Sequence, residues 1–163
     1  MEWFVRAFLK ASLAWLSLGV TLGATMAAHP EYTIYRPAHA HMMLLGFVTM
    51  MIFGVAYHVV PRFTGFPLHS RRAASWQWFL SNGGLALMVG GFVLRAHGAP
   101  AGTLVLSSGG VLAATSAYIF AWVLWRTIDG PRELREGARR AKEAAERARA
   151  VPLPVARRGV GGD

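Results

Sequence analysis

The chain has 163 residues, 54% of them hydrophobic, with no cysteine and a formal net charge of +9. The absence of cysteine excludes disulfides, thiolate metal sites and thiol redox chemistry. The net charge alone is typical of nucleic-acid-binding proteins, but the basic tail lacks interleaved aromatic residues, so no nucleic acid is expected as a partner.

Four long runs contain no Asp, Glu, Lys or Arg, namely residues 11–30, 37–61, 73–94 and 96–125. Each run reaches the roughly 20 residues that a helix needs to cross a bilayer. The sequence therefore predicts an all-α membrane protein, folded as a four-helix up-down bundle. The first run lacks a signal-peptide cleavage site and is predicted to be a span. The predicted spans are 7–28, 37–60, 74–95 and 102–125.

Basic residues predict the orientation of the spans. Most Lys and Arg residues lie near the N-terminus, in the 61–73 loop or after residue 128, whereas the other two loops hold only Arg36 and Arg95. The positive-inside rule places both termini and the 61–73 loop in the cytoplasm, and we expect the cytoplasmic membrane of a bacterium or archaeon. Five tryptophans fall at the same predicted interface: Trp3, Trp76, Trp78, Trp122 and Trp125.

Small residues recur at four-residue spacing in two predicted spans. The first span contains Gly19-x-x-x-Gly23, and the fourth has a stripe from Gly109 to Ala121. Helices in lipid associate by close packing at small residues, so both stripes predict helix contacts within the bundle. The stripe on the fourth span is also a candidate face for a homodimer.

The tail differs from the rest of the chain in composition. We expect a four-span membrane domain over residues 1–128 and a cytoplasmic tail over 129–163. The tail is predicted to be helical over 131–150, where Glu and Arg recur at helical spacing, and disordered over 151–163. We interpret the helix as a solvated segment that helps to fix the topology, with attraction to anionic lipid as the alternative.

Four of the six histidines are predicted to gather at the outer membrane face, at the ends of three different spans. Ionisable groups at membrane depth are candidates for function, and imidazole is the commonest metal ligand. The other two, His58 and His69, lie on the cytoplasmic side, where we expect interfacial hydrogen bonds. The four outer histidines are His29, His39, His41 and His97.

Helical geometry separates the pair in the second span. His39 and His41 point about 200° apart on a helix of about 100° per residue, so they cannot both ligate one metal. Gly46 and Gly54 follow His39 on one stripe, and Gly90 lies on a similar stripe of the third span. Such glycines predict room for a heme, edge-on between the second and third spans. A copper or zinc ion, which needs only imidazoles, and histidines without any cofactor are the alternatives.

Other catalytic patterns are absent from the sequence. No predicted span carries a carboxylate, which argues against a proton-coupled transporter. There is no Ser–His–Asp arrangement, phosphate-binding glycine loop or H-E-x-x-H motif, and whether the protein is an enzyme is left open. Asn82 and Ser116 are expected to make helix–helix or backbone hydrogen bonds.

The second predicted span resembles the second helix of heme–copper oxidase catalytic subunits. It begins R-P-A-H at residues 36–39 and ends Y-H-V-V-P-R at residues 57–62. In the cbb-type cytochrome oxidases and the related nitric oxide reductases, an R-P-x-H start and a Y-x-V-V-x-R end occur at this separation. Residues 38–47 also resemble small stand-alone proteins related to oxidase subunit I. The resemblance covers residues 5–65 and, loosely, 74–126.

The resemblance implies that His39 is an axial ligand of a low-spin heme b. The helices that carry the second axial histidine, the high-spin heme ligand and the copper-binding histidines have no counterpart in the four predicted spans. A complete oxidase or nitric oxide reductase is therefore not expected. The second axial ligand would come from His97, His41, His29, a second copy of the chain or an exogenous molecule.

The leading hypothesis is a heme b-binding membrane protein, expected as a homodimer. It would act in electron transfer, with respiratory-chain proteins or a quinone as partners, or in binding NO or O₂. The alternatives are a copper- or zinc-binding or assembly protein for a respiratory oxidase, with Met42 or Met43 as further ligands, and a cofactor-free accessory subunit. The candidate cofactor-binding residues are His39, His97, His41, His29, Gly46, Gly54 and Gly90.

Overall fold

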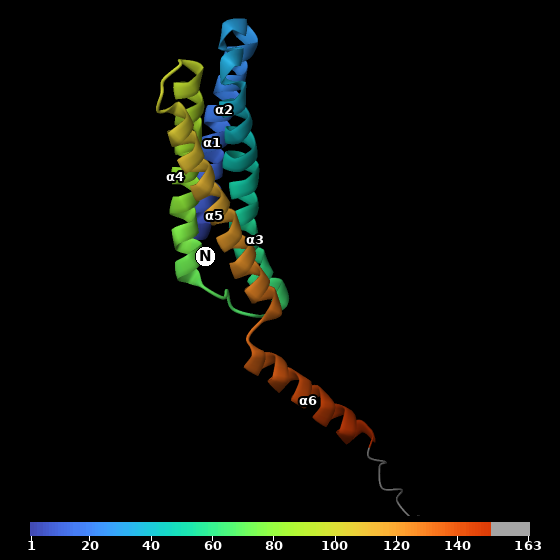
Figure 1. The fold of residues 1–163 in the computed structure, drawn as a ribbon. Coiled ribbons are helices and arrows are strands. Elements are labelled where there is room, and N and C mark those ends of the chain that lie inside the picture. Colours follow the sequence, from blue (N-terminus) through green and yellow to red (C-terminus); the bar gives the residue numbers. More distant parts are fainter. Residues whose placement is uncertain (151–163) are drawn as a thin grey trace, which may run out of the picture. The chain divides into compact units, whose positions relative to one another are not determined.

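The computed structural model describes residues 1–150, and it contains helices and no strand over that range. Four helical segments are long and apolar enough to cross a membrane, which confirms the predicted all-α, four-span fold. Figure 1 shows these segments running alternately up and down beside one another. They are α1 (Trp3–Ala28), the segment Pro30–Thr64, α4 (Arg71–Ala96) and α5 (Gly102–Asp129).

The second span changes helical type along its length. It starts as a 3₁₀-helix, continues as an α-helix, widens into a π-helix and returns to an α-helix. In the π segment the hydroxyl of Thr49 donates to the carbonyl of Leu44, five residues back, at 2.8 Å. The sequence predicts one helix over 37–60, and the wider turn shifts the side chains that follow it relative to those before it. The parts are η1 (Pro30–Tyr35), α2 (Arg36–His41), η2 (Met42–Thr49) and α3 (Met50–Thr64).

Local sequence explains several helix ends. The helix α1 stops before Pro30, which has no backbone N–H to continue the ladder. The helix α3 ends at Gly65, whose φ of +70° lies in the left-handed region that favours glycine. Ser70 caps α4, because its side chain accepts a hydrogen bond from the backbone N–H of Ala73 at 3.2 Å.

The apolar core lies between the first turns of α1 and the first half of α3, with side chains added from α4 and α5. Phe8 of α1 meets Phe53 of α3 edge to face, with ring centroids 5.7 Å apart. Phe53 also contacts Phe120 of α5, at 4.3 Å between centroids. The buried core residues are Phe4, Val5, Phe8, Met50, Phe53, Tyr57, Ala74, Leu85 and Val123.

Glycines bring α4 and α5 into backbone contact. A Cβ atom added at Gly84 would lie 2.8 Å from the backbone nitrogen of Ala113, and one at Gly109 would lie 2.6 Å from that of Met88. The predicted packing role of the small-residue stripe on the fourth span therefore holds at Gly109. The Gly109 end of the candidate homodimer face is covered by α4 of the same chain, whereas Ala121 at the other end is exposed.

The chain from Pro131 onward forms a separate unit, of which the structure describes α6 (Arg132–Ala150). Exposed ion pairs join residues four apart on α6, for example Arg139 and Glu143 with 3.4 Å between nitrogen and oxygen. Pairs of this kind stabilise a helix by only about 0.3–0.5 kcal/mol each. The predicted disorder of residues 151–163 falls outside the described residues.

We expect Gly84→Ala to lower the melting temperature of the detergent-solubilised protein by several degrees. The added methyl group would meet the backbone of α5, and such overpacking costs about 1–3 kcal/mol. Gly83→Ala is the matched control, because a Cβ atom there meets no heavy atom within 4 Å. Equal melting temperatures for the two variants would contradict the close contact between α4 and α5.

Candidate functional site

The imidazole of His39 is held by the neighbouring helix α1. His39 lies in α2, half-buried, and its Nδ1 atom is 2.9 Å from the carbonyl oxygen of Gly19. A carbonyl oxygen can only accept a hydrogen bond, so Nδ1 carries the ring hydrogen in this contact. The lone pair of the neutral ring is therefore on Nε2, the nitrogen that can bind a metal.

A glycine in α1 makes room for this ring. A Cβ atom at Gly23 would lie 2.9 Å from Cε1 of His39, and one at Gly19 would lie 2.6 Å from Sδ of Met43. The Gly19-x-x-x-Gly23 stripe thus forms a helix contact, as predicted from its spacing. That the second span presents His39 to this stripe could not be predicted, because spacing alone does not say which helix faces which.

His41 lies two residues after His39 and faces a different helix. Its Nδ1 atom is 2.8 Å from the carbonyl oxygen of Pro37 in the same helix. Its ring lies 4.8 Å, between centroids, from that of Phe92 in α4. His41 therefore points toward α4 and His39 toward α1, consistent with the angle expected from helical geometry.

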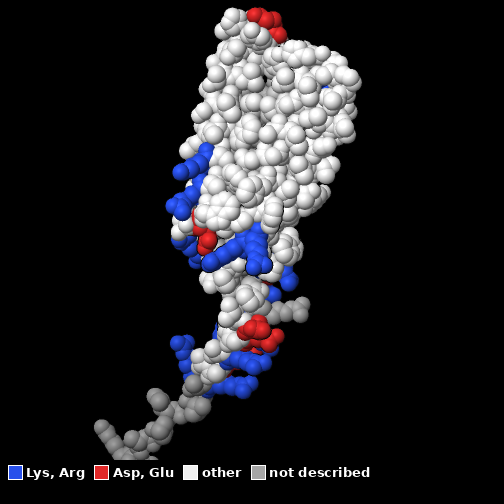
Figure 2. All heavy atoms as spheres, turned by 90° about the vertical axis from the view of Figure 1, so that its left-hand side faces the viewer, with Lys and Arg blue, Asp and Glu red and all other residues white. Residues whose placement is uncertain are grey.

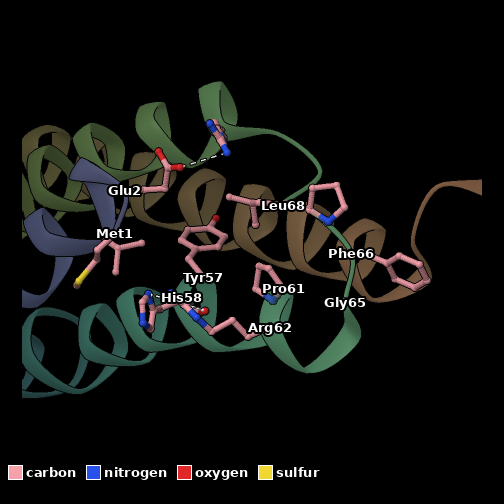
Figure 3. A pocket seen from close by; sticks show the side chains of 12 residues that line it. Met1, Glu2, Tyr57, His58, Pro61, Arg62, Gly65, Phe66 and Leu68 are labelled. Atoms are coloured by element: carbon pink, nitrogen blue, oxygen red, sulfur yellow. Dashed lines mark hydrogen bonds and ion pairs between the residues drawn. The ribbon is translucent and has the colours of Figure 1, made fainter. Parts of the chain in front are cut away.

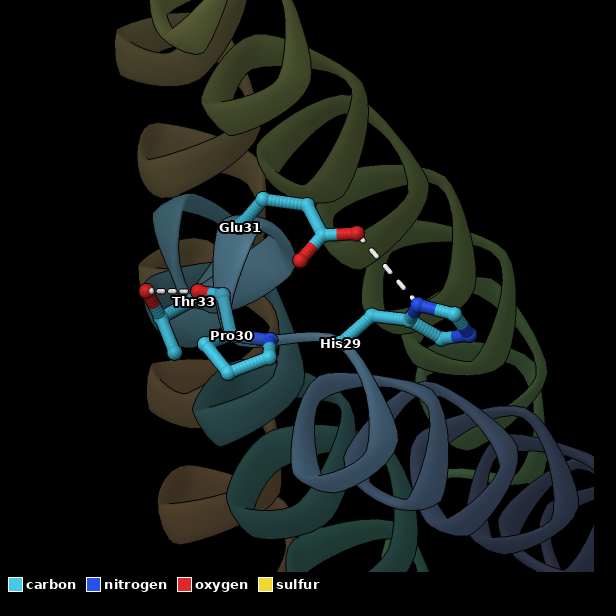
Figure 4. A network of polar contacts seen from close by, with 4 residues as sticks. All are labelled: His29, Pro30, Glu31 and Thr33. Carbon is cyan, nitrogen blue, oxygen red and sulfur yellow. Dashed lines mark hydrogen bonds and ion pairs between the residues drawn. The ribbon is translucent and has the colours of Figure 1, made fainter.

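His29 and His97 already have side-chain partners at the surface. His29 pairs with Glu31 at 3.3 Å, and Figure 4 shows its ring turned toward that carboxylate. Nε2 of His97 lies 2.8 Å from the hydroxyl of Tyr35. Within residues 1–150, apart from the few that are not described, no group of three or more His, Asp or Glu side chains is arranged to hold a metal ion.

The candidate glycines divide into two groups. Beside Gly46, the side chain of Trp15 fills the space, since an added Cβ atom would lie 2.6 Å from its Cβ. Beside Gly54, Leu9 does the same, at 3.1 Å. The room expected for a flat ring at these two positions is thus filled by side chains of α1. Gly90 is the one of these three glycines that faces open space, because a Cβ atom added there would meet no heavy atom within 4 Å.

The histidines at the opposite end of the bundle make local contacts. Nδ1 of His58 accepts a hydrogen bond from Arg62 at 2.8 Å. The ring of His69 lies edge to face with Trp122, and its backbone N–H donates to the hydroxyl of Thr127 at 3.0 Å. The four-residue spacing of His58 and Arg62 places both on one face of α3, and this spacing is the signal by which the pairing can be predicted.

These observations define a multi-pass helical membrane protein. Its second span carries a half-buried histidine, His39, that is oriented by a backbone carbonyl of the first span, that of Gly19. The family model of the cytochrome c and quinol oxidase polypeptide I matches residues 8–128, which include most of each span. The chain therefore belongs to this family, as the resemblance of its second span predicted. No curated protein matches the chain significantly.

Proteins of this family usually bind heme, so His39 can be tested for its fit to a heme iron. Metal-bound histidines almost always donate their other ring N–H to a carbonyl or carboxylate. The bond from Nδ1 of His39 to the carbonyl of Gly19 meets that requirement. Gly23, which has no side chain, leaves room for the ring beside α1. The hydrogen bonding of His39 therefore fits that of a heme ligand, whereas the space beside Gly46 and Gly54 is occupied by Trp15 and Leu9.

We expect Gly23→Ala to shift the NMR signals of the His39 ring in protein labelled with ¹⁵N-histidine. The new methyl group would lie 2.9 Å from Cε1, so the ring or the backbone beside it must shift, which changes the surroundings of the ring. Gly110→Ala serves as the control, because a Cβ atom there meets no heavy atom within 4 Å. Unchanged His39 signals in Gly23→Ala would contradict the observed contact.

Proposed function

We propose that this chain binds heme b through Nε2 of His39 and acts in electron transfer or in the binding of NO or O₂. The observation that carries the proposal is the hydrogen bond between Nδ1 of His39 and the carbonyl of Gly19. It holds the imidazole in the tautomer that a heme ligand needs. The bond of His41 to Pro37 lies within one helix, whereas the bond of His39 fixes its ring against the neighbouring helix α1. Membership of the oxidase polypeptide I family supports the same role.

The residues around His39 would position its imidazole and would take no part in the chemistry. The Gly19 carbonyl sets the plane of the imidazole and increases the basicity of Nε2, as second partners of metal-bound histidines do. Gly23 allows α1 to approach the ring. When bound, heme b supplies a one-electron redox couple or, with an open coordination position, a site for a diatomic gas.

We propose that the second axial ligand, where there is one, comes from outside this chain. The structure supports this because His29 and His97 already pair with other side chains and His41 faces α4. A second copy of the chain is the partner that we favour, in keeping with the expected homodimer. A respiratory-chain protein or a quinone would exchange electrons with such a heme.

The distribution of charge supports the proposed orientation in the membrane. Figure 2 shows Lys and Arg side chains gathered around the lower part of the four-span unit, whereas its upper part carries almost none. By the positive-inside rule, the basic end, with the N-terminus and the connection between α3 and α4, faces the cytoplasm. The His39 end then faces the outer side of a bacterial or archaeal cytoplasmic membrane.

We expect His39→Ala to abolish the Soret absorption of protein purified after expression with sufficient heme. His41→Ala is the closest control, because its ring faces α4 and not the Gly19-x-x-x-Gly23 stripe. That variant should keep the absorption, since the proposed ligand is intact. Retention of the full spectrum by His39→Ala would refute the assignment of the ligand.

Two further measurements separate the alternatives. A reduced spectrum that changes when NO is added indicates an open coordination position, and one that does not change indicates two protein ligands. If the wild-type protein has no Soret band, metal analysis decides between the remaining hypotheses. Stoichiometric copper or zinc would favour the metal-binding or assembly protein, and no metal would favour the accessory subunit.

A further inference from the structure

A cavity of about 510 Å³ lies where α1 begins, α3 ends and α4 begins. It is at the opposite end of the second span from His39, and the proposed function does not use it. Figure 3 shows Tyr57, Pro61 and Leu68 around its middle, with Arg62 on one side and Glu2 on the other. The lining residues used below are Glu2, Val5, His58, Pro61, Arg62 and Arg71.

Arg62 and His58 present hydrogen-bond donors at this cavity. Nη1 of Arg62 lies 2.8 Å from Nδ1 and 2.7 Å from the carbonyl oxygen of His58. A guanidinium group can only donate, so Nδ1 of His58 accepts and the hydrogen of the neutral ring is on Nε2. Arg62 keeps Nη2 and Nε for another acceptor, and the Nε2–H of His58 is a further donor.

The charged side chains at the cavity have a positive balance. Arg71 pairs with Glu2 at 3.3 Å, but the Arg71 side chain is 72% exposed and that of Glu2 is 42% exposed. Exposed pairs of this kind bind weakly, so Arg71 can turn toward a stronger anion. Glu2 is the one carboxylate among the lining residues, against the two arginines Arg62 and Arg71.

Exposed aromatic side chains place the cavity at the level of the lipid headgroups. Tryptophan is enriched where a membrane protein meets the membrane–water interface. Trp3 at the start of α1, Trp76 near the start of α4 and Trp125 near the end of α5 are all exposed at this end of the bundle. Phe63, next to Arg62, is 87% exposed and would lie among acyl chains or headgroups.

We infer that this cavity binds the phosphate headgroup of an anionic phospholipid. Arg62, Arg71 and the Nε2–H of His58 supply the donors for the phosphate, while Val5 and Pro61 supply an apolar wall for the glycerol and the first acyl carbons. Basic pockets at the cytoplasmic ends of membrane helices suit anionic headgroups. A zwitterionic lipid lacks the net negative charge that the two arginines require.

The inference is tested with the full-length protein in neutral detergent by native mass spectrometry. Phosphatidylglycerol and phosphatidylcholine with identical acyl chains are added separately, and the bound lipid is counted. We expect at least one phosphatidylglycerol to be retained in preference to phosphatidylcholine. Arg62→Gln and Arg71→Gln should each weaken this binding about tenfold, because each removes a charge-assisted hydrogen bond to the phosphate.

Matched variants separate this site from general attraction between charges. Arg72→Gln removes the same charge from the next residue, which is exposed and does not line the cavity, and should change binding by less than about twofold, because a neutral micelle has no surface potential. Arg62→Lys keeps the charge and should retain the preference. His39→Ala should also retain it, so a failure of the heme proposal is distinguishable from a failure of this one.

Three results would overturn the inference. The first is equal retention of the two lipids by the wild-type protein. The second is the same loss of binding in Arg71→Gln and Arg72→Gln. The third is complete displacement of phosphatidylglycerol by an equal concentration of inorganic phosphate, which would identify a simple anion site in place of a lipid site.

Discussion

The bilayer interior contains no water, and this constraint accounts for most of the structure. Backbone N–H and C=O groups must pair within the chain, so each span is a helix. The hydrophobic effect does not draw helices together in lipid, and close packing at small residues takes its place. The contact of Gly84 with the backbone of α5 and that of Gly23 with the His39 ring are two results of this requirement.

Polar side chains within the spans obey the same constraint. Trp15 of α1 donates to Asn82 of α4 at 3.1 Å, and Ser81 of α4 pairs with Ser116 of α5. His39 is another example, because its partner is a backbone carbonyl of α1. The bond that satisfies the polar ring within the bundle would also orient it as the proposed heme ligand.

The two ends of the four-span unit have different chemistry. His39 and His41 lie toward the end with few basic residues, where Tyr35 is the partner of His97 and Glu31 is the partner of His29. The other end combines exposed tryptophans with arginines around a cavity. A proposed heme ligand and a proposed lipid site are therefore separated along the length of the second span, and each can be altered without the other.

The sequence by itself determined the number of spans, the helical class and the family, because uncharged runs and the R-P-x-H motif are local along the chain. It also identified the Gly19-x-x-x-Gly23 stripe as a helix contact. Only the tertiary structure decided that His39 occupies this stripe and that Trp15 and Leu9 fill the space beside Gly46 and Gly54. Periodicity defines the faces of one helix, whereas the neighbour of each face depends on how all the helices pack and on the π segment that shifts one of them.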